Sequence, residues 1–595
     1  MKEMELSCGE VREAHIGKEV TLHGWCRYIR DHGGKLFIDI ADKHGATQLV
    51  FEGDVKSKAE RLGKEYVIEV TGKVNKRSEE TIDAKNPTGR IEVLVSTMKL
   101  LNESKLPPFE LIEEKEKFLA NEEIRLQYRY LDLRRPQALK HIVLKDKISK
   151  IVRQYFWDSE FMELETPIMI KDTYETGART FLVPSRFSKG KFYSLPQSPQ
   201  FYKQICMVSG LERYFQIAKC FRDEDPREDR QPEFTQIDIE VAFKDEKYIQ
   251  ALVEGMFKKI FKEAVGKGLK TPFKHLPFVE AMGRYGSDKP DLRYDNFLVD
   301  ITDEAVKSNY NILKRVAENG GKVKAIAFAG SKYSKESKIN ENYMLKTIEL
   351  AKSFGLRGLT WLYVKGGELR SEPQSIADSL KPVEKQLLKR LSPKDGDVVI
   401  IGSDLSERLL LDALGKLRKV ISDHIGIYGS EFSFLWVDEM PLFEVDEVTK
   451  KLKPAHNPVT APTIETEKLI DSAPEKVMSR QYDLVLNGYE LGSGSIRIID
   501  PKFQRKILKI LGMSDKTIEN SFGFLIEALS YGAPPHGGIG LGLDRIVALL
   551  SGESNIRDFI LFPKNKKGEL LLDGSPDVVD PKRLKDDFGI GHIEV

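Results

Sequence analysis

Residues 194–243 combine polar residue types and a spacing that could form a ligand site. Two runs of strand-forming residues, 214–221 and 234–243, flank a highly charged segment, which predicts a hairpin with a long polar tip. Arg222 and Glu224 follow the end of the first run. The second run alternates polar with apolar residues, and its polar members are Gln236, Asp238 and Glu240. A charged tip alone often only solvates a turn, but a polar strand face inside an apolar domain needs a ligand or a buried network.

The elements around this hairpin must hold it in place. An amphipathic helix is predicted before it, with Ile148, Ile151, Val152, Tyr155 and Phe156 spaced for one helical face. Residues 161–167 follow as a strand that ends in proline. Periodicity alone indicates a helix that packs on a core.

Length and composition indicate how many domains to expect and which class of protein this is. A chain of 595 residues is too long for one core, so several domains are expected. Apolar residues make up 41% and charged residues 31%, a balance typical of soluble globular proteins. The 93 basic and 92 acidic residues give a net charge of +1, so any contact with nucleic acid must come from local patches.

Cysteine usage and hydropathy indicate a cytoplasmic protein. Cys8, Cys26, Cys206 and Cys220 are scattered and form no Cys-x-x-Cys pair, which fits a reducing cytosol and argues against a zinc site or a disulfide framework. The N-terminus has no apolar signal core, and no run of 18 apolar residues occurs, so no membrane segment is expected.

The first hundred residues are predicted to form a small β-barrel. The strand-like runs are 20–25, 36–40, 48–51, 66–74 and 91–95, with turn-forming residues between them, which is typical of an OB-type barrel. Such barrels commonly bind single-stranded nucleic acid through aromatic and cationic side chains. Arg27, Arg30 and Phe37 could do so here. The alternative is that Phe37 belongs to the core and the arginines form a solvated rim, and this segment alone favours that alternative.

Five regions are expected along the chain, in a multidomain α+β fold. Residues 1–105 form the barrel, and 106–140 form a hinge, in which 113–123 is polar and helical. Residues 141–289 and 426–595 form the two parts of a larger domain, whose last stretch, 573–595, lies on the surface. Residues 290–425 are a separate α/β insertion, because strand-like runs at 325–329, 359–364 and 398–401 alternate with helical stretches and Gly366-Gly367 forms a turn.

The hairpin resembles motif 2 of the class II aminoacyl-tRNA synthetases. Phe-Arg-Asp-Glu at 221–224 and Gln-Pro-Glu-Phe-Thr-Gln-Ile-Asp at 231–238 are especially similar to bacterial-type aspartyl enzymes. Gly-Leu-Gly-Leu-Asp-Arg at 540–545 resembles motif 3, and residues 487–497 resemble the stretch before it. Residues 284–293 resemble the sequence that introduces a GAD-like insertion domain in those enzymes. The resemblance implies an OB anticodon-binding barrel, an antiparallel catalytic sheet and a homodimer built on the helix and strand at 148–167.

The implied first reaction is attack of the aspartate α-carboxylate on the α-phosphorus of ATP. This carboxylate is ionised at neutral pH, so catalysis should depend on alignment and on neutralised phosphate charge. The resemblance assigns catalysis to Arg222, Arg545 and Glu490, with Arg222 at the α-phosphate and Arg545 at the γ-phosphate. It assigns Mg²⁺ to Asp483 and Glu490, since hard oxygen ligands suit that ion. The implied ATP-binding residues are Arg222, Asp223, Glu224, Gln231, Phe234, Glu490, Gly542, Leu543, Asp544 and Arg545.

Selection of aspartate needs a fixed positive pocket for its side-chain carboxylate. The resemblance implies that Arg497 and Lys203 form it and that Asp238 orients Lys203. His456 aligns with a loop histidine that closes over aspartate, although a lone histidine is more often structural. The implied aspartate-binding residues are Thr176, Ser198, Gln200, Lys203, Arg222, Gln236, Asp238, His456 and Arg497.

Some positions depart from the family pattern. Thr176 stands where a glutamate near the amino group is usual, which puts that contact in doubt. Asn457 replaces a second histidine, Ser493 replaces a glycine, and Ala41 stands where an arginine is frequent. These departures leave the ATP-binding positions unchanged.

In the barrel, the resemblance implies anticodon contacts. Phe37 would stack a base, and its neighbours would contact base edges in a single-stranded loop. A histidine at position 32 accompanies family members that charge both tRNA-Asp and tRNA-Asn, so relaxed tRNA choice is a hypothesis here. The implied anticodon residues are Arg30, His32, Phe37, Gln48 and Glu92.

Three functions remain open on the sequence. The first is an aspartate–tRNA ligase that uses ATP and Mg²⁺. The second is a lysyl or asparaginyl sister enzyme, although a lysine pocket would want an acidic group where Arg497 stands. The third is a non-catalytic OB-containing RNA-binding paralogue, which would be expected to lose Arg222, Glu490 or Arg545, and all three are present.

Overall fold

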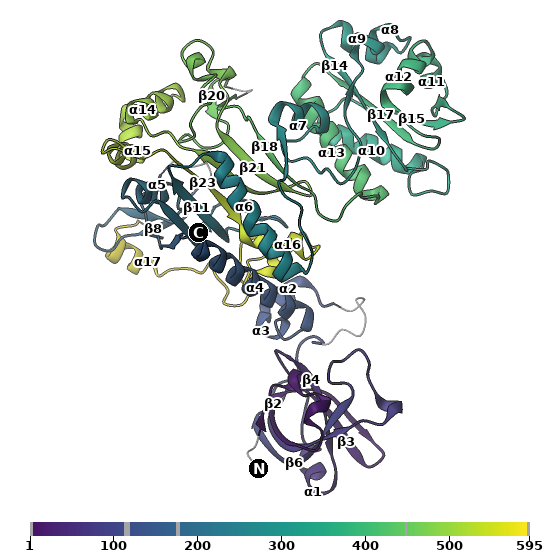
Figure 1. The fold of residues 1–595 in the computed structure, drawn as a ribbon, viewed down its shortest axis with the longest axis vertical. Coiled ribbons are helices and arrows are strands. Elements are labelled where there is room, and N and C mark those ends of the chain that lie inside the picture. The colour runs from purple at the N-terminus through teal and green to yellow at the C-terminus, as the bar shows by residue number, and fades with distance from the viewer. Residues whose placement is uncertain (1–3, 112–118, 174–178, 447–448, 592–595) are drawn as a thin grey trace. The chain divides into compact units, whose positions relative to one another are not determined.

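The computed structural model describes residues 4–111, 119–173, 179–446 and 449–591. Two compact units form (Figure 1). The first holds residues up to Lys147 together with Asp225–Pro232 and Glu553–Asp580, and the second holds Ile148–Glu224, Glu233–Gly552 and the residues from Pro581 onward. The hairpin's charged tip therefore belongs to the first unit while both of its strands belong to the second.

The first unit contains the predicted barrel, with every predicted strand present and longer than its apolar pattern. The strands are β2 (Glu19–His32), β3 (Lys35–Asp42), β4 (Gly45–Phe51), β5 (Val67–Lys76) and β6 (Ile91–Asn102). They pair in the order β2-β3-β4-β6-β5, and β5 pairs back with β2 and closes the barrel. A short β1 (Met4–Glu5) runs parallel to β2, and α1 (Gly53–Ala59) follows β4. Gly33 and Gly34 have φ of 60° and 81° in the β2–β3 turn, where other residues would be strained.

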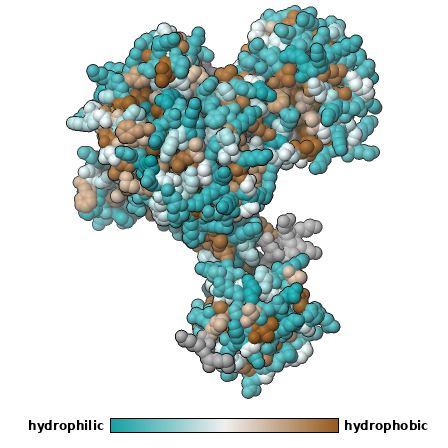
Figure 2. Space-filling model, in the orientation of Figure 1, coloured by the Kyte–Doolittle hydropathy of each residue, from teal (hydrophilic) through white to brown (hydrophobic). Residues whose placement is uncertain are grey.

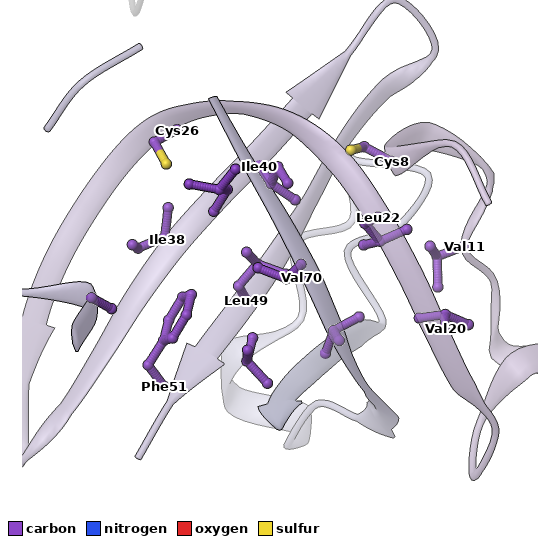
Figure 3. Packing of buried hydrophobic residues seen from close by; sticks show 14 of the residues in the cluster. Cys8, Val11, Val20, Leu22, Cys26, Ile38, Ile40, Leu49, Phe51 and Val70 are labelled. Atoms are coloured by element: carbon purple, nitrogen blue, oxygen red, sulfur yellow. The ribbon is translucent and has the colours of Figure 1, made fainter. Parts of the chain in front are cut away.

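Strand alternation divides the barrel into a core and an outer face. Leu36, Ile38 and Ile40 on β3 are buried, together with Cys8 and Cys26, as Figure 3 shows for several core residues. Phe37 lies between them on the outer face and is half-buried. The interpretation of Phe37 as a core residue is therefore wrong, because side chains alternate strictly along a strand.

The rest of the first unit is helical. It contains α2 (Glu122–Gln127), α3 (Arg129–Asp132) and the start of α4 (Pro136–Asp158). Asp132 is fully buried and accepts hydrogen bonds from Arg135, at 2.9 Å, and from Arg129. Arg129 also donates to the carbonyls of Ile560 and Leu561. The described part of the expected polar helix at 113–123 is only its end, since residues 112–118 lie outside the described ranges.

The second unit contains an eight-stranded sheet. Its order is β12-β18-β21-β22-β23-β11-β10-β7, and only the two outermost pairs are parallel. The predicted hairpin is confirmed as antiparallel β10 and β11, whereas the strand expected at 161–167 shortens to β7. The strands are β7 (Met162–Glu163), β10 (Arg213–Phe221), β11 (Glu233–Ala242), β12 (Lys274–Pro277), β18 (Phe434–Asp438), β21 (Gln481–Leu486), β22 (Tyr489–Ile496) and β23 (His536–Gly542).

Most helices of this unit bury an apolar face. The predicted helix face on α4 is confirmed, because Ile148, Val152 and Phe156 are fully buried. The other helices are α5 (Gln200–Val208), α6 (Glu246–Ile260), α7 (Phe278–Tyr285), α14 (Pro501–Ile510), α15 (Asp515–Leu529), α16 (Leu543–Leu550) and α17 (Pro581–Arg583). The second unit also contains two small hairpins: β8 (Leu182–Pro184) with β9 (Phe192–Ser194), and β19 (Phe443–Val445) with β20 (Leu452–Pro454).

The insertion forms its own sheet with helices on both faces. The sheet order is β13-β14-β17-β15-β16, and every pairing is antiparallel. The strands are β13 (Val299–Asp300), β14 (Lys322–Phe328), β15 (Thr360–Lys365), β16 (Glu368–Arg370) and β17 (Val398–Asp404). The helices are α8 (Thr302–Lys307), α9 (Asn311–Glu318), α10 (Glu341–Ser353), α11 (Ser375–Leu380), α12 (Glu384–Leu391) and α13 (Glu407–Ile425). Ile326 and Ile400 enter one apolar layer, and Ala325 and Ile401 enter the other.

The surface seen in Figure 2 is mainly hydrophilic, and the cysteines are not paired. Figure 2 shows hydrophilic side chains over most of the face in view, with hydrophobic ones in small groups. No helix among the described residues is long and apolar enough to cross a membrane. The four cysteines are free thiols.

Candidate active site

The central strands of the large sheet provide the floor of the candidate site. On β11, Gln236, Asp238 and Glu240 lie opposite Gly542, Gly540 and Gly538 of β23. A Cβ atom added to Gly538 would lie 2.1 Å from an oxygen of Glu240 and 2.0 Å from the carbonyl of Ile239. The glycines of β23 therefore leave the space that the polar side chains of β11 occupy.

Four charged side chains meet on this floor. Lys203 of α5 donates to Asp238 Oδ1 at 2.5 Å and lies 3.4 Å from Glu240 Oε2. Arg497, just after β22, donates from Nε and Nη2 to the two oxygens of Glu240 at 2.9 and 3.2 Å. All four side chains are at most 5% exposed. Two cations and two carboxylates thus share a dry interior, where unpaired charges would be very costly.

The pKa values in this cluster follow from burial and pairing. Burial raises the pKa of Asp238, and Lys203 opposes this only in part. Burial also acts to raise the pKa of Glu240, but Arg497 and Lys203 outweigh it and hold that pKa below its usual range. Glu240 is therefore the ionised partner that keeps Arg497 in place. The sequence placed Glu240 on the polar strand face but assigned it no role.

Some of the buried polar atoms that have no hydrogen-bond partner lie on the strands and helix around this cluster and are candidate ligand contacts. Within the described ranges, Gln200 Nε2, Arg222 Nε and Asp238 Oδ2 are buried and have no hydrogen-bond partner. Two are donors and one is an acceptor, which suits a small molecule with both acidic and basic groups. Ser198 lies just before α5 and is half-buried, and Gln236 Oε1 accepts a weak hydrogen bond from Cys220 Sγ at 3.2 Å.

Arg222 lies at the end of β10, and its guanidinium lies 5.1 Å from the ring centre of Phe234 on β11. This cation–π contact orients the arginine at the rim of the sheet. Glu224 follows on the same segment and is half-buried. The Asp223 N–H donates to the carbonyl of Arg179 at 3.1 Å, which fixes the strand end that carries Arg222.

The residues of the motif-3 resemblance lie where β23 meets α16. Asp544 is buried, and its Oδ2 accepts a hydrogen bond from the Thr235 N–H at 2.9 Å. The Leu543 side chain is 1% exposed, so only its backbone could meet a ligand. Gly542 has no Cβ and directly precedes α16, and Arg545 Nη1 donates to the carbonyl of Glu490 at 2.6 Å. Arg545 is thereby joined to β22.

The two carboxylates expected to bind Mg²⁺ lie on neighbouring strands. Asp483 on β21 pairs in register with Ser493 on β22, and Glu490 is the second residue of β22. Burial and the negative charge of Glu490 raise the pKa of Asp483 to about 6, while a hydrogen bond with Ser493 acts in the opposite direction. Gln481 Nε2 donates to Asp483 at 3.1 Å and also contacts Ser493. Two mutually repelling carboxylates of this kind favour a cation between them.

These two carboxylates already have a cationic neighbour. Lys289 Nζ donates to Glu490 Oε2 at 2.7 Å. Burial acts to raise the pKa of Glu490, but Lys289 outweighs it and lowers that pKa. The charge of His456 also acts to lower the pKa of both carboxylates. No group of three or more metal-ligating side chains occurs in the described part of the chain, so a metal here would complete its coordination with water or with a bound molecule.

One predicted site residue belongs to the first unit, and another is not described. Gln231 belongs to the first unit, where its Oε1 accepts a hydrogen bond from the Lys564 N–H at 2.9 Å. Thr176 lies outside the described residues. Lys289 was part of a stretch singled out by resemblance but was assigned no role, because its partner Glu490 is 201 residues away.

A second candidate site lies on the outer face of the barrel. Arg30 on β2 donates to Asp39 Oδ1 at 3.0 Å and to Gln48 Oε1 at 3.4 Å. Gln48 on β4 in turn donates to Glu92 on β6 at 3.0 Å. Phe37 lies opposite Arg30 in the register of β2 and β3, and His32 is exposed at the adjoining turn. The five predicted anticodon residues therefore follow neighbouring strands on one side of the barrel.

Comparison with known proteins gives two family matches. Residues 121–566 match the family described as tRNA synthetases class II (D, K and N), and residues 20–101 match an OB-fold nucleic acid binding domain. The aspartate–tRNA ligase of Macrococcus caseolyticus is 44% identical over 588 residues, which covers 97% of each chain. The aspartate–tRNA(Asp/Asn) ligase of Desulfatibacillum aliphaticivorans is 44% identical over 584 residues, covering 97% of this chain and 96% of the relative.

The solved structures agree on the fold. Asparaginyl-tRNA synthetase from Pyrococcus horikoshii, complexed with asparaginyl-adenylate, has a TM-score of 0.58 at 20% identity. The match covers 95% of this chain and 98% of that one. At this identity the similarity establishes the fold, and the site must be argued from its own residues.

Proposed function

This chain belongs to the class II tRNA synthetases for aspartate, lysine and asparagine, and we infer that it is an aspartate–tRNA ligase. The enzyme would join aspartate to ATP as aspartyl-adenylate, with release of pyrophosphate, and then transfer the aspartyl group to the 3'-terminal adenosine of tRNA. The observation that carries aspartate as the substrate is the buried pair of cations, Lys203 and Arg497, on the same floor as the unpartnered Gln200 and Asp238 atoms.

Arg497 and Lys203 can accept the side-chain carboxylate of aspartate without reorganising. Each is already fixed by an anionic partner, so the positive charge is present and oriented before the substrate arrives. The unpartnered acceptor Asp238 Oδ2 can bind the substrate ammonium, and the unpartnered donor Gln200 Nε2 can bind a carboxylate oxygen. A lysine substrate would place a third cation in this cluster, which disfavours the lysyl alternative.

Arg222 and Arg545 are proposed to bind the triphosphate. The guanidinium of Arg222 would bridge the α-phosphate and the attacking carboxylate, which neutralises charge and aligns the two groups. Phe234, beneath Arg222, would stack on adenine. Asp483 and Glu490 would hold Mg²⁺, whose charge would neutralise the triphosphate when bound. Ser493 and Gln481 hold the Asp483 carboxylate in place for this purpose.

The outer face of the barrel is proposed to bind the anticodon of tRNA-Asp. Phe37 offers a ring for stacking, and Arg30, Gln48 and Glu92 offer donors and acceptors for base edges. Charging of tRNA-Asn as well is a finer proposal, supported by His32 on the same face and by a relative named for both tRNAs. Because tRNA is used in the cytoplasm, we expect the enzyme to act there.

A homodimer is also proposed. Trp157 at the end of α4, Met162 on β7 and Met169 are 50%, 42% and 59% exposed. A second copy of this chain would cover these exposed apolar side chains, in a symmetric arrangement of the kind that is common in oligomers. Analytical ultracentrifugation tests this directly, and Trp157→Glu with Met162→Glu should shift the protein to monomer.

The test of the main proposal is aspartate-dependent exchange of pyrophosphate into ATP without tRNA. Exchange with aspartate, and none with lysine or asparagine, is the expected result. Exchange with lysine or asparagine instead would identify a sister enzyme. Absence of exchange with all three, in a folded protein that binds ATP, would favour the non-catalytic RNA-binding alternative. Aminoacylation of pure tRNA-Asp and tRNA-Asn would then decide the range of tRNA substrates.

A further inference from the structure

We propose that Lys289 is a positioning residue of the metal and ATP site: it holds Glu490 before the divalent cation binds, and it moves to the triphosphate when the cation arrives. This inference rests on the proposed function. It gives the entrance of the insertion a part in nucleotide binding, which its position in the sequence does not suggest.

The positive charge of Lys289 lies among three carboxylates. Lys289 Nζ lies 2.7 Å from Glu490 Oε2 and 3.3 Å from Asp288 Oδ2, and its charge also interacts with Asp483. Without a metal, Lys289 is the largest of the positive charges that stabilise the ionised Glu490, ahead of Arg545 and His456.

Lys289 and a divalent cation would compete for the carboxylate of Glu490. Mg²⁺ coordinates carboxylate oxygens at about 2.0–2.1 Å and requires nearly octahedral geometry. An ammonium 2.7 Å from the same Glu490 oxygen would lie within a few ångströms of the ion and be strongly repelled. The lysine and the metal therefore compete for Glu490. The released ammonium has a flexible four-carbon stem, and the nearest new anion would be the triphosphate.

The backbone around Lys289 is held in place, so only the lysine side chain can move. The Lys289 N–H donates to Ser287 Oγ at 3.1 Å. Two residues later, the carbonyl of Asp291 accepts a hydrogen bond from Arg418 Nη2 of α13 at 2.9 Å. A Cβ atom on Gly415 of the same helix would lie 2.0 Å from the carbonyl of Gly286. The helix α13 of the insertion thus clamps both sides of the segment that presents Lys289.

Replacement of Lys289 should have opposite effects on the binding of a divalent cation and on the binding of ATP. Replacing the lysine should strengthen binding of a divalent cation by the nucleotide-free enzyme, because a competing cation is removed. It should weaken ATP binding, because a cation for the triphosphate is lost. A residue with only a structural role would, when removed, weaken both.

The test compares Lys289→Met with the wild-type enzyme and with Lys289→Arg. Binding of Mn²⁺ without nucleotide, followed by electron paramagnetic resonance of the free ion, should become about five- to tenfold tighter in Lys289→Met. The KM for ATP in pyrophosphate exchange should rise by a similar factor. Lys289→Arg should retain wild-type behaviour in both measurements, since the cation is kept. Lys267→Met, which removes an exposed lysine paired with Glu431, is the matched control and should change neither.

Two further variants assign the effect to this site. Asp483→Asn in the Lys289→Met background should abolish the gained Mn²⁺ affinity. Mn²⁺ affinity in Lys289→Met that is equal to or weaker than wild type would overturn the proposal, and so would the absence of a saturable Mn²⁺ site in both proteins. The Mn²⁺ measurement needs neither aspartate nor tRNA. If the exchange reaction failed, the ligase proposal would fall while this measurement kept its meaning.

Discussion

The buried cluster on the large sheet and the outer face of the barrel use similar side chains in opposite surroundings. In the cluster, Arg497 and Lys203 are 4% and 2% exposed and meet carboxylates that have no contact with water. On the barrel, Arg30 is 54% exposed, and its partner Asp39 is 23% exposed. Charges in a dry site are strong and hardly screened by salt, whereas exposed pairs contribute little and are screened.

The difference matches the two proposed tasks. A small amino acid offers few groups, so its selection depends on a rigid site that penalises a mismatched charge. An anticodon offers large rings and several base edges, so an adaptable and wet surface is sufficient. The comparison teaches that the same residue types can provide strict or adaptable recognition, and that burial decides which.

The largest expected effect comes from removing a buried cation. Arg497→Leu should lower kcat/KM for aspartate in pyrophosphate exchange by about 10³-fold, because Glu240 is left buried without its partner and the substrate carboxylate loses its own. Arg480→Leu breaks the more exposed pair with Glu246 and is the matched control. Thermal unfolding of both variants separates lost binding from lost fold. A loss smaller than tenfold would mean that Arg497 is not the carboxylate site.

The next effect concerns stability. Glu240→Gln should lower the free energy of unfolding of the second unit by about 3–5 kcal/mol, since it leaves Arg497 and Lys203 with one carboxylate between them. Glu92→Gln on the barrel should change stability by less than about 0.5 kcal/mol, because that side chain is half-exposed. Equal shifts in Tm for the two variants would contradict the contrast between the regions.

A smaller effect is expected at the barrel. Phe37→Ala should raise the KM for tRNA-Asp about tenfold, from the loss of one stacked base, and leave tRNA-independent exchange unchanged. Raising the salt concentration from about 50 to about 200 mM should increase the KM for tRNA far more than that for aspartate. If salt raised the KM for tRNA and the KM for aspartate equally, the aspartate pocket would have to be exposed to solvent. The matched variant Phe51→Leu, in the barrel core, reports on fold alone.

The smallest effect comes from a pair of intermediate exposure. His275 Nδ1 lies 2.7 Å from Asp438 Oδ2 at the edge of the large sheet, and this hydrogen bond raises the pKa of His275 above its usual value. A raised histidine pKa stabilises the fold below the unfolded value of about 6.5, and this stabilisation disappears as pH rises through the raised value. Because His275 is 46% exposed, the contribution should be below about 1 kcal/mol. His275→Gln should flatten the pH dependence of unfolding above pH 6.5, whereas a steeper dependence would contradict the assignment.

Local patterns predicted the fold well. The five barrel strands, the hairpin β10–β11, the buried face of α4 and the main strands of the insertion were all visible as periodicity. The strand expected at 161–167 forms only at Met162–Glu163, because β10 offers it pairing partners only there. The short helices α2 and α3 were missed, since their stabilising contacts come from residues more than 400 positions away.

The site was less predictable because its contacts are distant in sequence. The alternation on β11 indicated that Glu240 faces a polar site, but its partner Arg497 is 257 residues away. Lys203 and Arg497 were identified through resemblance, and no spacing rule would have found them. The link between Lys289 and Glu490 spans 201 residues and joins the entrance of the insertion to the catalytic sheet, so it required the structure.

The division of the first unit among three stretches of chain has a consequence for synthesis on the ribosome. The barrel can fold as soon as its last strand emerges, since its strands pair only with one another. Arg129 must instead wait for the carbonyls of Ile560 and Leu561, and Glu122 must wait for Arg557. At about 5–20 residues per second, the separation of 432 residues between Arg129 and Leu561 corresponds to roughly 20–90 s. During that interval the nascent chain would carry a folded barrel next to helices α2 and α3 that still lack their C-terminal hydrogen-bond partners.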